Sequence, residues 1–180
     1  MSDFETEPLS ASDVESDFSC GQPQLDDYFK RHALSNDWRG IGKTFVLHAK
    51  ETDPKDLPHV LGFYSLSMAE LATKLPSRLP RALRKGLPKY PLPVALIGRL
   101  AVDHRAQRHG LGERLLGDAL ARVHAAATLL GCFGVIVDAK DREAVAFYET
   151  KYGFVPLDPG GSVPQRLFLP MATLADAGSR

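Results

Sequence analysis

The sequence has few cysteines and no long apolar run, and each absence excludes a class of protein. Only Cys20 and Cys132 occur in 180 residues, far apart and in apolar surroundings, which argues against a disulfide framework and favours buried thiols in a reducing compartment. No apolar run approaches the roughly 18 residues that a membrane span requires, and the acidic N-terminus lacks the pattern of a secretion signal. The sequence therefore predicts a soluble, cytoplasmic protein.

The formal net charge is zero, because 22 Lys and Arg residues balance 22 Asp and Glu residues. The total thus gives no argument for a nucleic-acid partner, but the distribution is uneven. Residues 1–17 carry only acidic charges, and we expect a flexible leader there. Residues 75–93, here called the basic excursion, are rich in proline and hold Arg78, Arg81, Arg84, Lys85 and Lys89 without an acid. A basic face is compatible with this neutral chain.

The length and the 44% hydrophobic content allow one substantial core and make two ordinary domains a poor fit. We expect a single domain over residues 18–172 and a short tail over 173–180. Apolar spacing predicts helices over 23–39, 111–130 and 141–154. Alternating or continuous apolar runs predict strands over 44–49, 60–69, 94–103, 132–139 and 165–174, the first two forming a hairpin. The basic excursion should be irregular or briefly helical.

The stretch QRHGLGERLL, residues 107–116, places two glycines between a predicted strand and a predicted helix. Such a turn exposes backbone N–H groups at the positive end of the helix dipole, where phosphate can bind. A dinucleotide-binding fingerprint would need glycine or alanine where Leu115 stands. The glycines could also serve only the tight turn. From this stretch alone, phosphate binding and a plain structural turn both stay open.

Two motifs in the expected order resolve that choice by resemblance. Gln107 to Gly112 matches the Q/R-x-x-G-x-G/A acyl-CoA motif of the GNAT N-acetyltransferases, and Ala146-Phe147-Tyr148 with Gly153-Phe154 is similar to that family's A-F-Y…G-F ending. The resemblance covers about residues 18–169. It implies an α/β (α+β) GNAT fold, in which a bent, mostly antiparallel mixed sheet is flanked by helices and a splayed central strand pair binds acetyl-CoA. The residues it assigns to the cofactor are Leu100, Ala101, Val102, Gln107, Arg108, His109, Gly110, Leu111, Gly112 and Phe147.

The same resemblance implies a catalytic role for Tyr148 as the general acid beside the sulfur of coenzyme A. Acetyl transfer needs a neutral amine, a polarised carbonyl and a proton for the departing thiolate. No carboxylate stands out as a general base; Glu70, Asp103 and His104 are the candidates. An α-amino group, with a pKa near 7.7–8.0, needs a strong base less than a lysine does. The chain departs from many small-molecule GNAT enzymes in having Lys140-Asp141 ahead of the tyrosine motif.

The N-terminal half narrows the acceptor, again by resemblance. Phe18-Ser19-Cys20-Gly21, Leu25 to Phe29, Gly62 to Leu66 and Gly98 to Asp103 look like the GNAT toxins of type II toxin–antitoxin modules. Membership would imply acetylation of the α-amino group of aminoacyl-tRNA, inhibition of translation, a ribbon-helix-helix antitoxin and a homodimer. Basic residues that could line a tRNA groove are Arg39, Lys43, Arg78, Arg81, Arg84, Lys85 and Lys89.

Other functions remain as alternatives. A GNAT enzyme could acetylate a small amine or a protein N-terminus, and an acyl-CoA-binding protein could keep the cofactor turn with little turnover, although Tyr148 disfavours the latter. We expect no metal, because the six histidines form no metal-ligand motif in the sequence. No G-x-S-x-G nucleophile motif is present either.

Overall fold

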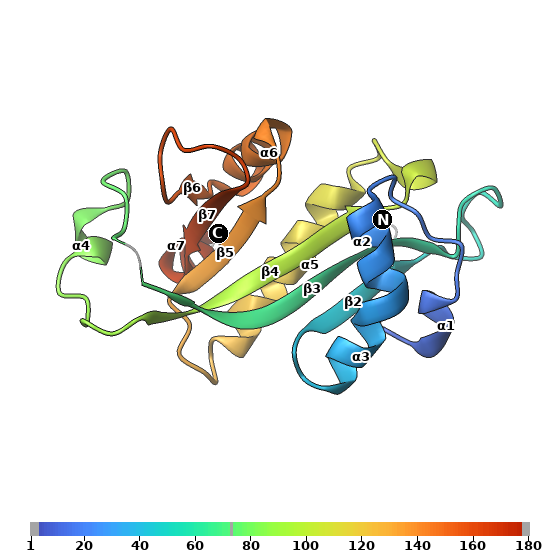
Figure 1. The fold of residues 1–180 in the computed structure, drawn as a ribbon, viewed down its shortest axis with the longest axis horizontal. Helices are drawn as coiled ribbons and strands as arrows, with labels where there is room; N and C mark the ends of the chain where they lie inside the picture. Colours follow the sequence, from blue (N-terminus) through green and yellow to red (C-terminus); the bar gives the residue numbers. More distant parts are fainter. Residues whose placement is uncertain (1–3, 73, 178–180) are drawn as a thin grey trace. The chain divides into compact units, whose positions relative to one another are not determined.

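The computed structural model describes residues 4–72 and 74–177. Its strands form one seven-stranded sheet in the order β1-β2-β3-β4-β5-β7-β6 (Figure 1). β1–β2, β2–β3, β5–β7 and β6–β7 pair antiparallel, and β4–β5 pair parallel, so the mixed, mostly antiparallel sheet expected from the sequence is confirmed. The chain divides into two compact units, Met1–Ser67 with Gly98–Ala119, and Met68–Ile97 with Leu120–Arg180.

The first unit contains the N-terminal helices and the predicted hairpin. Its elements are β1 (Glu7–Pro8), α1 (Ala11–Val14), α2 (Pro23–Asp27), a π-helical turn η1 (Tyr28–His32), α3 (Ala33–Trp38) and β2 (Lys43–His48). It also holds most of β3 (Val60–Leu71), the end of β4 (Leu92–Val102), the 3-10 turn η2 (His104–Ala106) and the start of α5 (Leu111–Ala126). The predicted helix 23–39 is thus three consecutive helical segments.

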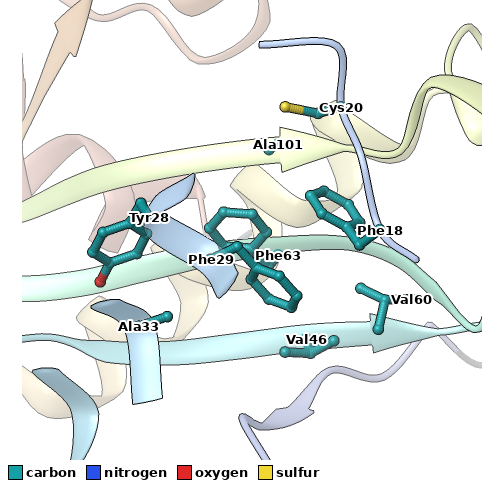
Figure 2. Packing of buried hydrophobic residues seen from close by; sticks show 9 residues of the cluster. All are labelled: Phe18, Cys20, Tyr28, Phe29, Ala33, Val46, Val60, Phe63 and Ala101. Carbon is teal, nitrogen blue, oxygen red and sulfur yellow. The ribbon is translucent and has the colours of Figure 1, made fainter. Parts of the chain in front are cut away.

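An aromatic cluster holds these N-terminal helices on the sheet. Phe63 of β3 lies 4.6 Å from Phe29 and 5.5 Å from Phe18, measured between ring centroids, and all three side chains are fully buried. Figure 2 shows the cluster, with Val46 and Val60 contributed by the hairpin. Burying each such ring stabilises the fold by about 1.5–3 kcal/mol. The cluster anchors the segment before α2 close to the end of β4, where the candidate site begins.

Residues 7–14 correct the expectation of a flexible leader. Glu7 and Pro8 pair with Val46 and Phe45 of β2, and α1 follows at once. The reason is local: Asp13 is buried, and its carboxylate accepts hydrogen bonds from the backbone N–H and hydroxyl of Ser10, each at 2.8 Å. A run of acidic residues is therefore part of the folded unit.

The second unit carries the remaining strands and helices. They are α4 (Arg81–Arg84), β5 (Gly134–Ala139), α6 (Arg142–Tyr152), β6 (Val155–Pro156), β7 (Gln165–Pro170) and α7 (Met171–Ala177). β5 is parallel to β4 at Ala95–Ile97 and antiparallel to β7 along its whole length. In Figure 1, α6 lies beside β5 and β7.

Two element ends differ from the sequence prediction. The predicted strand 165–174 ends at Pro170, and the chain turns into α7, where the amide of Met171 donates to Phe133 O at 3.0 Å. The helix predicted to reach residue 130 ends at Ala126. Leu129 and Leu130, which follow it, are exposed. β4 is less covered than a fully buried strand, because Gly98 and Arg99 are exposed.

Candidate functional site

An ion pair between Asp103 and Arg105 forms the turn that follows β4. The carboxylate of Asp103 is fully buried and accepts hydrogen bonds from the amide of Ser19 at 3.0 Å, the amide of Arg105 at 2.9 Å and the guanidinium of Arg105 at 3.0 Å. Burial raises the pKa of Asp103, but the bonds from Arg105 and Ser19 outweigh it and hold the pKa below its ordinary value. Asp103 therefore positions the turn, and its bonds to Arg105 and Ser19 argue against a role as the general base.

Two of the predicted cofactor residues stabilise the turn with their side chains. The amide nitrogen of Gln107 donates to Val102 O at 3.0 Å and to Cys20 O at 3.1 Å. His109 Nδ1 lies 3.3 Å from Ala106 O. The side chain of Gln107 thus connects the end of β4, the turn and the segment before α2, which the motif alone did not indicate.

The backbone of the turn has the shape of an anion site. Arg108 and Gly110 both adopt left-handed conformations, with φ of 67° and 73°, and α5 begins immediately afterwards at Leu111. The first N–H groups of a helix have no partner within it, and successive amides next to left-handed residues form a concave, positive surface. The predicted residues 108–112 can hold the pyrophosphate of coenzyme A in this way.

The end of β4 leads straight into that turn. Ala101 is buried, whereas Leu100 and Val102 are partly exposed. Gly62 of β3 packs against this end so closely that a Cβ on it would lie 2.8 Å from Ala101 O. Leu100, Ala101 and Val102, which the resemblance assigns to the cofactor, therefore belong to a tightly packed strand end that connects directly to the anion turn.

A cavity of about 370 Å³ lies beside the turn within the first unit. One wall comes from the turn and the start of α5, including Arg105, His109 and Arg114. The other wall comes from the N-terminal segment and the β2–β3 connection, including Lys50 and Asp53. Sequence reasoning missed this cavity, because its walls are far apart along the chain and carry no motif.

In the second unit, α6 holds Tyr148. The carboxylate of Asp141 caps the helix by accepting from the amide of Ala144 at 2.8 Å, and Gly153 ends it in a left-handed conformation. The cap explains the aspartate ahead of the tyrosine motif. The Tyr148 ring contacts Phe147 and the buried Phe154 edge to face, at 5.2 and 5.5 Å between centroids.

The phenol of Tyr148 is kept in its protonated form. Burial disfavours the phenolate and raises the pKa of Tyr148 to about 12. The hydroxyl can therefore donate a hydrogen bond throughout the neutral range. Phe147, which the resemblance assigns to the cofactor, packs against one side of the ring.

The basic excursion is connected to this helix. Arg78 Nη1 lies 3.3 Å from Oε1 of Glu149, the residue after Tyr148. Arg84 Nε donates to Leu79 O at 2.8 Å, while Arg81, Lys85 and Lys89 are exposed. Five of the seven predicted tRNA-binding residues thus belong to the same unit as Tyr148. Arg39 and Lys43 belong to the first unit, where Lys43 Nζ pairs with Asp37 at 2.8 Å.

The basic excursion also forms a cavity of about 460 Å³. Arg84 and Lys89 contribute to its lining, together with Lys74 and Tyr90, which the sequence reasoning had not selected. Tyr90 is 70% exposed. An exposed aromatic ring beside cations is a feature that stacks on unpaired bases.

The sequence of this chain is similar to those of known acetyltransferases. The model of the acetyltransferase (GNAT) domain matches residues 94–175. A tRNA-acetylating toxin of Mycobacterium tuberculosis is 37% identical over 152 residues, which cover 84% of this chain and 85% of the toxin. The chain belongs to the GNAT acetyltransferases. A probable toxin TacT of Sinorhizobium fredii is 33% identical over 87% of this chain and 84% of its own length. This GNAT protein is an acetyl-CoA-dependent N-acetyltransferase related to the tRNA-acetylating toxins.

Solved structures of KacT and of the toxin AtaT have the same fold. A tyrosine-to-phenylalanine mutant of KacT has a TM-score of 0.82 and 26% identity, covering 97% of this chain and 98% of KacT. AtaT complexed with acetyl-methionyl-tRNAfMet has a TM-score of 0.81 and 27% identity, over 98% and 99% of the two chains. Mutant AtaT bound to the C-terminus of the antitoxin AtaR and to acetyl-CoA has a TM-score of 0.73 and 25% identity, each chain being covered to 99%. Among the residues described here, no helix of the acetyltransferase is both long and apolar enough to cross a membrane.

Proposed function

We propose that this acetyltransferase is the toxin of a type II toxin–antitoxin module and transfers acetyl from acetyl-CoA to the α-amino group of aminoacyl-tRNA in the cytoplasm. The observation that carries the proposal is the contact between Arg78 and Glu149, because it places the basic excursion beside the helix of Tyr148. Such a cluster of cations attracts a polyanionic acceptor, whereas a small amine would gain no binding energy from it. The relationship to tRNA-acetylating toxins supports the same acceptor.

The chemistry proposed for the site needs no strong base. The α-amino group is partly neutral near pH 7, since its ordinary pKa is about 7.7–8.0. Asp103 is held by Arg105 and Ser19, and His104 Nδ1 lies 2.8 Å from Ser19 O. These two candidates are thus engaged in the turn, and a neutral α-amine makes a base from this turn unnecessary.

We assign Tyr148 a hydrogen-bond role at the departing sulfur. The amine nitrogen attacks the thioester carbon, the C–S bond breaks, and the proton lost by the nitrogen balances the thiolate. A thiol has an ordinary pKa near 8.5, well below the value of about 12 for Tyr148. Full proton transfer from the phenol is therefore unfavourable, and the phenol stabilises the developing negative charge as a donor. The amides of residues 108–112 and the end of β4 would hold the rest of acetyl-CoA.

The proposed partners follow from the same relationship. We infer an antitoxin of the ribbon-helix-helix class and a homodimeric toxin; the AtaT complex with the C-terminus of AtaR supports an antitoxin partner. No metal enters the proposed acetyl transfer, because each step uses only the amine, the thioester and Tyr148.

The test is incubation of the purified protein with labelled acetyl-CoA and total charged tRNA, followed by nuclease digestion and mass identification. We expect N-acetylated aminoacyl-adenosine, absent with deacylated tRNA and strongly reduced with Tyr148→Phe. Label on small amines or peptide N-termini, with none on charged tRNA, would instead establish the alternative acceptor. Binding of acetyl-CoA without turnover on any acceptor would leave only an acyl-CoA-binding protein.

A further inference from the structure

Three side chains with metal-binding atoms meet at the end of the β2–β3 hairpin, outside the acetyl-transfer residues. His48 Nε2 lies 2.7 Å and His59 Nε2 4.0 Å from Oδ1 of Asp13. One donor atom from each residue falls within 4.8 Å of both others. Asp13 is buried, and the side chains of His48 and His59 are 21% and 64% exposed. An ion could therefore reach the group from solvent.

The hairpin register creates this meeting point. The pairing of β2 with β3 shifts between Leu47 and His48, so that Leu47 faces Gly62 while His48 faces Val60. The amide of Ala49 then donates to His59 O at 2.8 Å. The two imidazole rings stack with centroids 4.8 Å apart and an angle of 27° between their planes. Both Nε2 atoms are thus directed at one carboxylate, although the histidines lie 11 positions apart in the sequence.

A second layer of contacts orients two of the three donors. Oδ2 of Asp13 accepts from the amide and the hydroxyl of Ser10 at 2.8 Å, which leaves Oδ1 for the histidines. Nδ1 of His48 lies 3.2 Å from the carboxylate of Glu7. Metal-binding histidines commonly donate their second N–H to a carboxylate in this way, which fixes the tautomer with a lone pair on the other nitrogen. A neutral His48 that donates to Glu7 presents that lone pair to the position beside Asp13.

We propose that His48, His59 and Asp13 form a Zn²⁺ site, with water as the fourth ligand. Two imidazoles and a carboxylate are ligands that zinc takes in tetrahedral geometry at about 2.0–2.2 Å, which places ligand atoms roughly 3.4 Å apart. The separation of 2.7 Å between His48 and Asp13 would open, and the separation of 4.0 Å between His59 and Asp13 would close. Each adjustment is less than about 1 Å, and the exposed His59 side chain can supply the second of them.

The site would fasten the N-terminal segment to the hairpin. Asp13 lies in α1, and Glu7 lies in β1, so zinc would join residues 7–14 to β2 and β3. Binding to the folded chain alone stabilises it by linkage, and the melting temperature should rise with zinc concentration. This site adds to the acetyltransferase function and does not depend on which acceptor is used. It differs from the expectation of no metal, which rested on spacing along the chain.

Zinc binding can be measured on the full-length protein without a polyhistidine tag. Isothermal titration with ZnCl₂ after chelator treatment should show one equivalent bound, and Co²⁺ should give the visible absorption of a tetrahedral complex. His59→Ala should abolish stoichiometric binding while leaving the fold intact, because this side chain is mostly exposed. Glu7→Gln should weaken binding by about 10–100-fold.

The matched control is His124→Ala, which removes an exposed histidine from α5 and should bind zinc as the wild type does. If the wild-type protein takes up no zinc, or if His59→Ala binds it equally well, the proposal is wrong. Acetyl-transfer assays are not needed for either outcome.

Discussion

Arg78 and Glu149 connect the basic excursion to α6, with 3.3 Å between Nη1 and Oε1. Both side chains are partly exposed, at 61% and 32%, so the pair itself should contribute no more than about 1 kcal/mol to stability. Its importance is positional, because Glu149 directly follows Tyr148. The remaining cations of the excursion are thereby held on the same unit as the phenol, where a polyanionic acceptor would need them.

Neutralising two of those cations should affect the tRNA and spare acetyl-CoA. Arg81 and Lys85 are exposed, and the double variant Arg81→Gln, Lys85→Gln should raise the KM for charged tRNA. Each lost phosphate contact should reduce the slope of the logarithm of the tRNA binding constant against the logarithm of salt concentration by about 1. The control Lys55→Gln removes an exposed charge from the β2–β3 connection. An unchanged slope in the double variant would mean that these cations are only solvated.

Tyr148→Phe should remove most of the turnover while leaving the binding of acetyl-CoA intact. The ring packing on Phe147 and Phe154 is retained in phenylalanine, and only the donor at the sulfur is lost. We expect kcat to fall by about 10²–10³-fold, the range typical of removing one hydrogen-bond donor from a developing negative charge. Tyr152→Phe, on the same helix, is the matched control and should keep its activity.

The pH profile offers a separate check on Tyr148. With a pKa of about 12, the phenol stays protonated below about pH 11, so its ionisation should add no falling limb to kcat between pH 6 and 9. The acceptor amine should instead give a rise as it loses its proton near its pKa of about 7.7–8.0. A falling limb in that range that disappears in Tyr148→Phe would contradict the raised pKa.

Asp103→Asn should destabilise the protein and loosen the cofactor turn. The variant loses charge-assisted bonds from Arg105 and leaves a guanidinium with weaker partners, at a cost of about 1–3 kcal/mol in the free energy of unfolding. Acetyl-CoA binding should weaken as well, because the same bonds position the turn before Arg108. Urea unfolding and calorimetric titration measure the two effects.

The destabilisation should depend on pH with a defined sign. The pKa of Asp103 is lowered from 3.8 in the folded protein, so the unfolded chain binds the proton more readily. The stability that Asp103 contributes is therefore present above pH 3.8 and is lost as the pH falls through the folded pKa. The difference between wild type and Asp103→Asn should be largest at neutral pH and shrink in acid. A difference that grows in acid would contradict the lowered pKa.

Gly62→Ala tests the tight packing at the end of β4. The added Cβ would meet Ala101 O and Leu115 Cδ1, each at 2.8 Å. The backbone oxygen cannot move without shifting the strand, so we expect a loss of about 1–3 kcal/mol in the free energy of unfolding. Gly42→Ala is the control, since its nearest neighbour would be Leu66 O at 3.6 Å. Equal melting temperatures for the two variants would show that β4 can shift at little cost.

Local signals in the sequence were enough for the turn and its helix. Arg108 to Gly112 follow a strand and precede an apolar stripe, so their place at the start of α5 could be predicted from neighbouring residues alone. The burial of Asp13 could not be predicted, because its partner His48 lies 35 positions away and the neighbouring acidic residues indicated exposure to solvent. The hydrogen bond from Gln107 to Cys20 O could not be predicted for the same reason. Contacts between distant segments decide these features, and a single sequence gives no direct sign of them.

Tyr90 provides the sharpest test of how the acceptor is bound. Its ring is 70% exposed at a cavity that Arg84 and Lys89 also line, and an unpaired base stacked on such a ring contributes about 1–3 kcal/mol. Tyr90→Leu should raise the KM for charged tRNA accordingly, whereas Tyr90→Phe keeps the ring and should behave as the wild type. Urea unfolding should be unchanged in both, because the side chain is largely solvated. If Tyr90→Leu acetylates charged tRNA with the wild-type KM, the aromatic ring takes no part in binding, and the attraction must come from the cations of the basic excursion alone.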